Sequence, residues 1–500
     1  MLNKTGSILA TFVLLITGLT PISCDQADEK AKSNALIRAC SDSEVSADQL
    51  VPLLASGAAV GARDQSGDTP LMLAVRHEGG VEKIRLLLEA GANVNERGEA
   101  GQTPLIIAAQ FADGPVIDLL KLNGASLSAR CEEGRTPAMW AVCEGKSAGL
   151  VEEMLDDESQ IDLPDNSGRT MLEQAATMGN ADVVATLIRL GADVHRENRE
   201  GKRLVQWAIE SAKPSVVNAF VTSTLDVGAT DELGWTLLRH AVEGERPEVL
   251  KTILSVNGGI GVADADGFTP LMRASVLGKQ ELLVLLLGAG SQPNAVDKYG
   301  MSALMHASKA GHIQSLELLL GEGADIHATS HDVGQTALMY ALRTVDPQVI
   351  EYLLKRGARL SEMDSNGDTP LHLAVNQNTS VAVIKALLRG GAEVNARNHL
   401  GQTPLIAAAW FNERQPPKVV HVLLQHGAEI NAIDFRGRTA LICAAQSSKN
   451  QYILRRLLRA PEADANLRDH EGLRALDHIN KHPEEFEPDT IKKLERASLE

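Results

Sequence analysis

Short apolar runs separated by polar turns divide this chain into units of nearly constant length. In each unit a polar turn closes on a glycine, and a first apolar run follows it directly. A second apolar run begins about fifteen residues later, as in Ile84–Leu88 and Val420–Leu424. Runs of this length, bounded by turn residues, predict two short helices per unit joined to the next unit by an extended loop.

Glycines mark the end of the polar turn in every unit. They are spaced 33 or 34 residues apart, except for the last two intervals of 36 and 35, and they stand at Gly67, Gly101, Gly134, Gly168, Gly201, Gly234, Gly267, Gly300, Gly334, Gly367, Gly401, Gly437 and Gly472. Many are followed by Thr-Pro-Leu, as in Thr69-Pro70-Leu71 and Thr403-Pro404-Leu405. Because threonine caps a helix and proline suits its first turn, the first helix is expected to begin there.

The second apolar run ends at Gly-Ala in many units, as at Gly91-Ala92 and Gly427-Ala428, where glycine suits the left-handed residue that ends a helix. One such unit cannot bury its own apolar face and must stack on copies of itself. The pattern resembles the ankyrin repeat. The resemblance implies an all-α repeat solenoid with about thirteen repeats over residues 33–472 and a degenerate capping repeat over 473–500.

Repeats four to seven depart from the pattern. Glu158, Thr224 and Asn257 stand where a glycine is expected to end the second helix, and Arg203-Leu204-Val205 replaces Thr-Pro-Leu in the sixth repeat. A non-glycine residue at a left-handed position costs on the order of 1 kcal/mol. The middle of the array is therefore expected to be its least stable part, and limited proteolysis is expected to cut first between about residues 150 and 260.

The first residues do not follow the repeat and resemble an export signal. Lys4 precedes the twelve-residue apolar stretch Ile8–Leu19, which is too short for a membrane-spanning helix. Residues 1–23 are therefore interpreted as a signal peptide and 24–32 as a polar linker. Cys24 follows Ser23 as in a bacterial lipoprotein signal, although Pro21 departs from that motif. Either Cys24 carries a lipid anchor, or cleavage near Ser23 leaves the cysteine incidental. The expected location is the bacterial periplasm, the envelope or the exterior.

Composition narrows the classes of function. The net charge is −17, from 65 acidic and 48 basic side chains, which disfavours nucleic acid as a partner. Five cysteines make no disulfide framework, no later apolar run is long enough to span a membrane, and no phosphate-binding glycine motif occurs. His372 and His312 match positions with a structural role in the repeat. We therefore expect no enzyme activity, no cofactor and no metal, with a monomeric chain that binds protein.

One position of the first helix changes character along the chain. Apolar in early and late repeats, it becomes amphipathic or polar in repeats four to ten: Trp140, Gln174, Trp207, His240, Arg273, His306 and Tyr340. Stacked repeats would align these side chains in one row, and tryptophan, tyrosine and arginine are enriched at binding hot spots. The alternative is a half-buried position that tolerates any large side chain with a polar end.

The turn tips form a second candidate surface. Lys298, Tyr299, Phe435 and Arg436, with His331 and His399, stand at positions expected to face solvent. An aromatic residue there adds little to folding, which favours contact with a partner, although isolated exposed apolar residues are common. The predicted function is protein binding through the concave face and the tips. The alternative is an envelope-tethered spacer or assembly scaffold without a single specific partner.

Overall fold

The computed structural model describes residues 22–499 except 78–79, 113, 199–200, 224–227, 232–233, 257–258, 345, 378–379, 411–416 and 447–449. Throughout those residues the regular elements are helices, with three isolated antiparallel bridges between hairpin arms, such as Val296 with Ser302. The expected all-α repeat solenoid is confirmed. The chain forms two compact units, one up to Leu225 and the other from Asp226.

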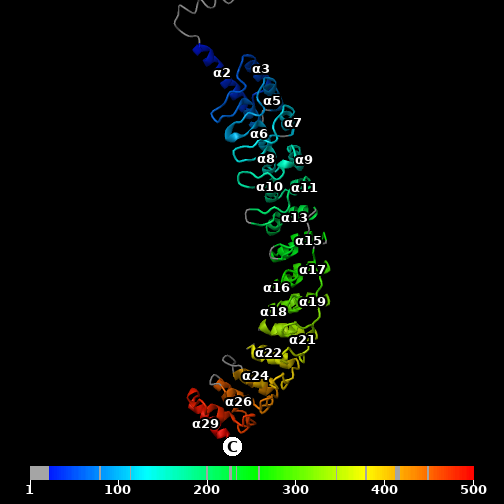
Figure 1. Cartoon of the computed structure of the whole chain (residues 1–500), viewed down its shortest axis with the longest axis vertical. Helices are drawn as coiled ribbons and strands as arrows, with labels where there is room; N and C mark the ends of the chain where they lie inside the picture. The colour runs from blue at the N-terminus through cyan, green and yellow to red at the C-terminus, as the bar shows by residue number, and fades with distance from the viewer. Residues whose placement is uncertain are drawn as a thin grey trace, which may run out of the picture. The chain divides into compact units, whose positions relative to one another are not determined.

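The first unit begins with a long helix and continues as helix pairs. Helix α2 spans Ile22–Ser41. The first helices of the following repeats are α4 (Pro70–Arg76), α6 (Pro104–Phe111), α8 (Pro137–Cys143), α10 (Met171–Met178) and α12 (Leu204–Glu210). The second helices are α3 (Leu50–Ala55), α5 (Gly80–Glu89), α7 (Gly114–Leu122), α9 (Ala148–Glu153), α11 (Ala181–Arg189) and α13 (Pro214–Val221), with 3-10 turns at η1 (Ala47–Gln49), η2 (Glu99–Gly101) and η3 (Glu158–Gln160). The first helices pack on one another from repeat to repeat, as do most of the second helices, so the repeats stack side by side (Figure 1).

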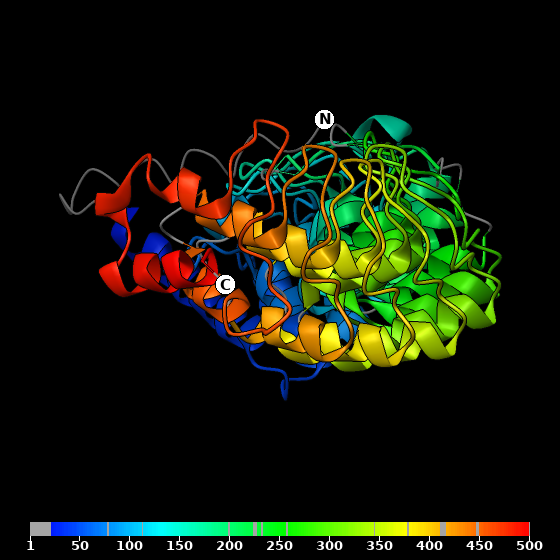
Figure 2. The same cartoon turned by 90° about the horizontal axis from the view of Figure 1, so that it is seen from below.

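The second unit repeats this arrangement up to the last residues. Its first helices are α14 (Leu237–Glu243), α16 (Pro270–Leu277), α18 (Ala303–Ala310), α20 (Ala337–Ala341), α22 (Pro370–Asn376), α24 (Pro404–Trp410), α26 (Ala440–Ala445) and α28 (Ala475–Ile479). Its second helices are α15 (Pro247–Leu254), α17 (Gln280–Gly288), α19 (Ile313–Gly321), α21 (Pro347–Lys355), α23 (Val381–Arg389), α25 (Pro417–Gln425), α27 (Gln451–Leu457) and α29 (Pro488–Ala497), with η4 (Leu342–Thr344) and η6 (Pro483–Glu485). Its hairpins leave the helical layers side by side (Figure 2).

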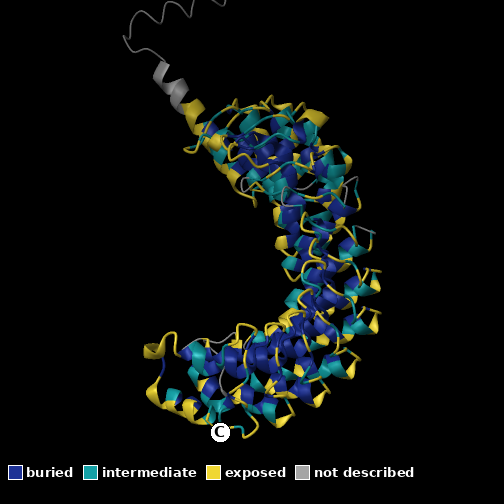
Figure 3. Ribbon diagram, turned by 60° about the horizontal axis from the view of Figure 1, so that its bottom comes forward, coloured by how far each residue is buried: buried dark blue, intermediate teal, exposed yellow. Residues whose placement is uncertain are grey.

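Threonine caps start the first helices as the sequence predicts. The hydroxyl of Thr103 accepts a hydrogen bond from the Ile106 N–H at 3.3 Å, and Thr136 and Thr269 bond the third following amide in the same way. Proline follows the cap in these helices, where a backbone N–H would have no partner within the helix. Leucine, isoleucine, valine and alanine predominate in the core between the helices. The buried residues form a continuous band through the stacked helices of each unit (Figure 3).

The turn glycines are needed for the backbone conformation of the hairpins. All thirteen adopt positive φ, between 65° and 89°, where a β-carbon is strained. In most of these turns an aspartate stands three residues before the glycine and holds the turn: Oδ1 of Asp297 accepts the N–H groups of Tyr299 and Met301, both at 2.9 Å. Successive hairpins also bond to each other, as in the His331 N–H donating to the Tyr299 carbonyl at 2.9 Å.

Two left-handed positions in the central repeats lack glycine. Gly179, Gly278 and Gly311 end their first helices with φ between 69° and 83°, whereas Ala212 and Glu245 occupy the equivalent turns with φ of 52° and 54°. This is strain that the sequence pattern did not identify. Of the three predicted losses of a glycine cap, Glu158 opens η3 behind the Asp157 cap, while Thr224 and Asn257 lie outside the described residues.

The segment predicted as a polar linker, residues 24–32, is helical and continues into the first repeat as part of α2. This segment contains alanine, glutamate and lysine, which favour helix, and Lys32 pairs with Asp28 one turn earlier at 2.6 Å. Residues 1–21 of the predicted signal lie outside the described residues. At the other end, α29 packs on α27 and α28, in the place expected for a capping helix.

Candidate functional site

In the first unit the predicted row on the first helices is half-buried. Trp140, Gln174 and Trp207 lie at the same position of α8, α10 and α12, which pack side by side. The Arg135 guanidinium lies 4.8 Å from the centre of the Trp140 ring, and the Lys213 ammonium lies 5.7 Å from that of Trp207. Both indoles thus present part of their surface next to a cation, an arrangement that suits contact with a partner.

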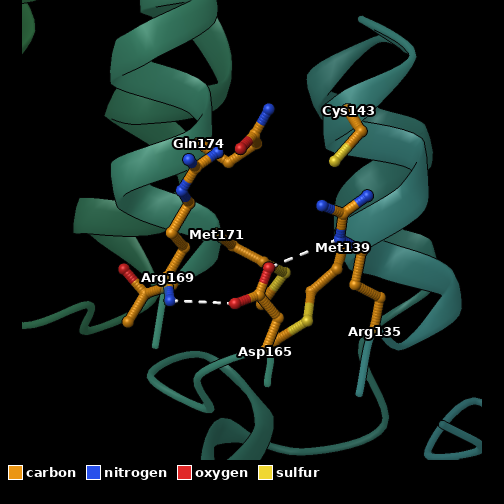
Figure 4. Close-up of a pocket in the computed structure, with 8 residues that line it drawn as sticks. Arg135, Met139, Cys143, Asp165, Arg169, Met171 and Gln174 are labelled. Atoms are coloured by element: carbon orange, nitrogen blue, oxygen red, sulfur yellow. Dashed lines mark hydrogen bonds and ion pairs between the residues drawn. The ribbon is translucent and has the colours of Figure 1, made fainter. Parts of the chain in front are cut away.

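A small hollow lies between α8 and α10, where residues on and just before the two helices face each other, among them Arg135, Cys143, Asp165 and Gln174 (Figure 4). Nε of Arg135 lies 3.4 Å from Oδ2 of Asp165, and the Arg169 N–H donates to Oδ1 of the same carboxylate at 3.0 Å. Burial opposes ionisation of Asp165, but hydrogen bonds from Ser167 and the two arginine residues outweigh it and hold the pKa of the carboxyl below its usual value. Burial raises the pKa of the neighbouring Cys143 thiol, so this hollow holds no activated nucleophile.

In the second unit the polar ends of the row are bonded within the protein. Nε2 of His240 lies 2.8 Å from Oδ2 of Asp231, and the Arg273 guanidinium pairs with Glu243. These two side chains remain half-buried. His240 and Arg273 lie at the surface of the first helices, but each is already bonded to a carboxylate, Asp231 or Glu243. Another protein would therefore contact each pair as a unit.

His306 and Tyr340 are buried, at 9% and 4% exposure, and cannot present a binding surface. Nε2 of His306 lies 2.8 Å from Oδ2 of Asp297, and the Phe268 ring packs against the imidazole with centroids 4.6 Å apart. Burial lowers the pKa of His306 despite the aspartate. The Tyr340 hydroxyl donates to the Ser330 hydroxyl at 3.1 Å. At these two positions the structure favours the alternative of a large side chain with a satisfied polar end.

Sequence reasoning missed the aromatic residues that follow two turn glycines. Trp235 and Phe268 lie 4.8 Å and 5.4 Å from the guanidinium carbon of Arg239, which is thus held between the two rings. The same arginine donates to Oδ2 of Asp264 at 3.0 Å. The sequence signal was present, since Gly-Trp-Thr and Gly-Phe-Thr place an aromatic residue between the turn and the helix cap.

The tip residues predicted to face solvent do so. Tyr299 is 49% exposed, and Phe435 is 69% exposed. Lys298 donates to Asp266 of the preceding hairpin at 2.6 Å, and this bond raises the pKa of its ammonium group. Arg436 is exposed. Whether these side chains contact a partner stays a prediction.

The ring of a tip residue often covers the glycine of the preceding turn. A β-carbon at Gly300 would meet His331, and one at Gly401 would lie 2.7 Å from Cδ1 of Phe435. His399 covers Gly367 in the same way. Part of the reason for histidine and phenylalanine at the tips is therefore structural, although Phe435 keeps most of its surface free.

The side chains assigned a structural role have one. Nε2 of His312 donates to the Val276 carbonyl at 3.0 Å, and Nε2 of His372 donates to the Gln402 carbonyl at 2.9 Å, both in the preceding or following repeat. Cys131 and Cys143 are free thiols, as expected. No group of histidine, cysteine and carboxylate side chains suited to a metal ion occurs among the residues that the structure describes.

Comparison with known proteins identifies the repeat. The family model described as ankyrin repeats (3 copies) matches overlapping segments that extend from residue 6 to 198 and from 205 to 469. Neurogenic locus notch homolog protein 1 is 30% identical over 160 residues in Danio rerio and 31% identical over 135 residues in Homo sapiens, which is 32% and 27% of this chain. The chain spans only 6% and 5% of the length of these relatives. The ankyrin repeat domain of Bcl-3 aligns over 44% of this chain and 97% of its own, with 24% identity and a TM-score of 0.40.

Proposed function

This chain belongs to the ankyrin-repeat family, and from that premise we propose that it is an exported protein that binds another protein through the exposed part of its first helices and through its hairpin tips. Ankyrin repeats generally mediate protein–protein interaction and are typically non-enzymatic scaffolds. The array extends over nearly the whole chain, so the proposed activity belongs to the repeats themselves.

The observation that carries this proposal is the pair of partly exposed tryptophans in the first unit. Trp140 and Trp207 stand where other repeats bury Leu73, Ile107 or Leu373. The indole N–H of Trp140 is itself buried and has no hydrogen-bond partner among the described residues, so it is the exposed part of the ring that would contact a partner. Large rigid rings beside cations are typical of binding hot spots.

Export is proposed from the first residues. A lysine, a twelve-residue apolar stretch and a small residue before Cys24 support passage across a membrane, with the periplasm, the envelope or the exterior as the final location. Within the part of the chain that the structure describes, no helix is long and apolar enough to cross a membrane. Mass spectrometry of the protein isolated from its native cells tests this: a mature chain that begins near residue 24 supports export, with a lipid on Cys24 if it is anchored. An intact Met1 start overturns it.

Partner binding is tested by affinity purification with the full chain and a double variant. Trp140→Ala combined with Trp207→Ala should lose a partner that the wild-type protein retains after stringent washing. The control is Tyr452→Ala, which removes an aromatic ring 59% exposed on the second helix α27. Circular dichroism and a melting curve show whether each variant is folded. Recovery of the same proteins by all three chains overturns binding through the first helices and favours a spacer or scaffold.

A further inference from the structure

Exposed apolar side chains gather on two neighbouring hairpins of the second unit. Leu400 is 62% exposed, Phe435 69% and Ile433 45%, and they stand on the hairpins of residues 397–402 and 433–438. The described hairpins of the first unit carry no large apolar side chain of comparable exposure. Because soluble proteins keep large exposed apolar groups apart, such a cluster marks an interaction site.

Hydrogen bonds make the two hairpins one surface. The Phe435 N–H donates to the Leu400 carbonyl at 3.1 Å, and Nη1 of Arg397 donates to the Ile433 carbonyl at 2.6 Å. The Phe435 ring rests against Gly401 of the neighbouring turn. The hairpins lie side by side in the orange part of Figure 2. The three apolar side chains are therefore held in fixed relative positions, which lowers the entropy cost of binding.

The surface continues from the hairpins to the first helix α24. Asp434 accepts from Nε and Nη2 of Arg438 at 2.9 and 2.7 Å, and the Arg438 guanidinium lies 4.2 Å from the centre of the Trp410 ring. Trp410 is 40% exposed. A buried ion pair thus supports an exposed indole at the end of α24, in the same two repeats.

This surface is positive on an acidic protein. Arg397 and Arg436 are exposed, and neither guanidinium forms an ion pair with a carboxylate of the described residues. The only carboxylate on the two hairpins, Asp434, is buried and bonded to Arg438. The first-unit tips carry Glu99, Glu132 and Glu133 instead, and the whole chain has a net charge of −17. The charge of the two hairpins is therefore a local reversal.

We propose that Leu400, Ile433, Phe435, Arg397 and Arg436, here called the apolar–cationic patch, dock an acidic segment of a partner protein that carries large apolar side chains. The proposal rests on the proposed function as a protein binder and adds the location and the chemistry of the partner. Apolar side chains of the partner would cover Leu400, Ile433 and Phe435, while its carboxylates would pair with the two unpaired guanidinium groups. Nucleic acid offers negative charge without aliphatic side chains, so it would leave Leu400, Ile433 and Phe435 without apolar contacts.

The test uses the full chain and a fluorescein-labelled synthetic peptide that alternates Asp or Glu with Phe and Leu. Fluorescence anisotropy should show saturable binding that weakens as salt is raised. A peptide with Lys in place of the acids, and another with Ser in place of Phe and Leu, should bind at least about tenfold more weakly. Failure of the acidic apolar peptide to bind, or equal binding of the lysine peptide, overturns the proposal.

Variants locate the binding surface. Leu400→Ser combined with Phe435→Ser should weaken peptide binding by at least about tenfold, as should Arg436→Glu. Tyr452→Ser, which removes an exposed aromatic ring from a second helix of the same unit, should bind as the wild type does. All three variants change exposed side chains only, and melting curves that match the wild type will confirm that each variant is folded. Wild-type affinity in both patch variants overturns the assignment.

Two other occupants give distinct results. If the chain binds phosphatidylglycerol vesicles and the peptide does not compete for that binding, the partner is a membrane surface and the proposal is overturned. Concentration-dependent self-association of the wild type, lost in the Leu400→Ser/Phe435→Ser variant, would make the partner a second copy. Loss of peptide binding leaves the Trp140/Trp207 purification result untouched, so failure here and failure of the proposed function are separable.

Discussion

Replacing Gly300 with alanine tests whether glycine is needed there because the next hairpin lies so close, and not only because the turn requires a positive φ. Gly300 and Gly472 both end a hairpin turn in the second unit, with φ of 76° and 77°. A β-carbon at position 300 would lie 2.5 Å from the backbone nitrogen of His331 and against its ring, whereas one at position 472 would meet nothing within 4 Å. Gly472→Ala is therefore a matched control.

The two substitutions should differ by several-fold in their effect on the free energy of unfolding. A left-handed alanine costs roughly 1–2 kcal/mol, offset by roughly 0.4–1 kcal/mol from the less flexible unfolded chain, so Gly472→Ala should lose about 1 kcal/mol. At Gly300 the next hairpin must also move. The 2.9 Å bond from the His331 N–H to the Tyr299 carbonyl would be lost, at about 1 kcal/mol, with about 1–3 kcal/mol of overpacking. Gly300→Ala should therefore lose about 3–5 kcal/mol.

Hydrogen exchange is the suitable assay, together with urea unfolding. Long repeat arrays can unfold in steps, so a single transition is not assured, and exchange reports the local stability of α18 and α20 directly. Gly300→Ala should accelerate exchange in these two helices, while Gly472→Ala should affect only α28 and α29. Adding His331→Ala to Gly300→Ala should restore only part of the loss, because the backbone overlap remains. Equal losses for the two glycine variants would refute the argument from close approach.

Four further outcomes are expected. Ala212→Gly should stabilise α12 and α13 by roughly 0.5–1 kcal/mol, because it relieves an alanine at φ 52°, and should slow their hydrogen exchange. Lys83→Met should destabilise the start of the array by about 1–3 kcal/mol and speed exchange in α2, because the buried Lys83 ammonium donates to the Asp42 carbonyl at 2.7 Å. Burial lowers the pKa of His306, so the unfolded chain binds a proton at this histidine more readily than the folded chain does. The neutral histidine therefore contributes its full stability above the ordinary pKa of 6.5, and the stability of the fold falls as the pH drops below that value. Melting curves of the wild type and of His306→Gln across this pH range will show the difference. Limited trypsin digestion should cut first between about residues 150 and 260.

Each of these has a control or a contrary result. Ala310→Gly, at the exposed last residue of α18, should lose stability by at most about 0.5–1 kcal/mol, so a loss at Ala212 as well would contradict the strain argument. Lys121→Met, whose exposed ammonium donates to the Glu153 carbonyl, should change stability by less than about 0.5 kcal/mol. An identical pH dependence in His306→Gln would remove the histidine from the explanation. Cleavage at the chain ends alone would contradict a weak centre.

Much of the fold could be predicted because its signals are local. Thr103 caps α6 with its own hydroxyl, and Gly300 turns left-handed because glycine lacks a β-carbon. The helix over 24–32 could not be predicted from apolar periodicity, because a polar segment without it can still form a helix when its residues favour one and the following helix extends into it. The strain at Ala212 and Glu245 was missed, although Gly179, Gly278 and Gly311 mark the same left-handed position in other repeats.

The candidate site could be predicted as a set of positions but not as a surface. His240 and His306 occupy the same position two repeats apart and both bond an aspartate nine residues earlier, yet one is half-buried and the other buried. An aromatic ring lies beside each imidazole: the centre of Trp235 is 5.3 Å from that of His240, and the centre of Phe268 is 4.6 Å from that of His306. Leu400 and Ile433 were not selected because an apolar residue near a turn is common, and only the adjacent hairpins make the two a cluster with Phe435.

By itself the sequence determined the repeat, its period, the helix starts and the left-handed turns, because capping and backbone preference act within a few residues. The tertiary structure alone decided which of several similar side chains reach solvent. That property depends on the packing of neighbouring repeats, about one period away along the chain, and it buried His306 while leaving His240 half-buried. The same stacking placed Arg397 and Arg436 beside apolar side chains and away from carboxylates, so the apolar–cationic patch exists only in the folded array.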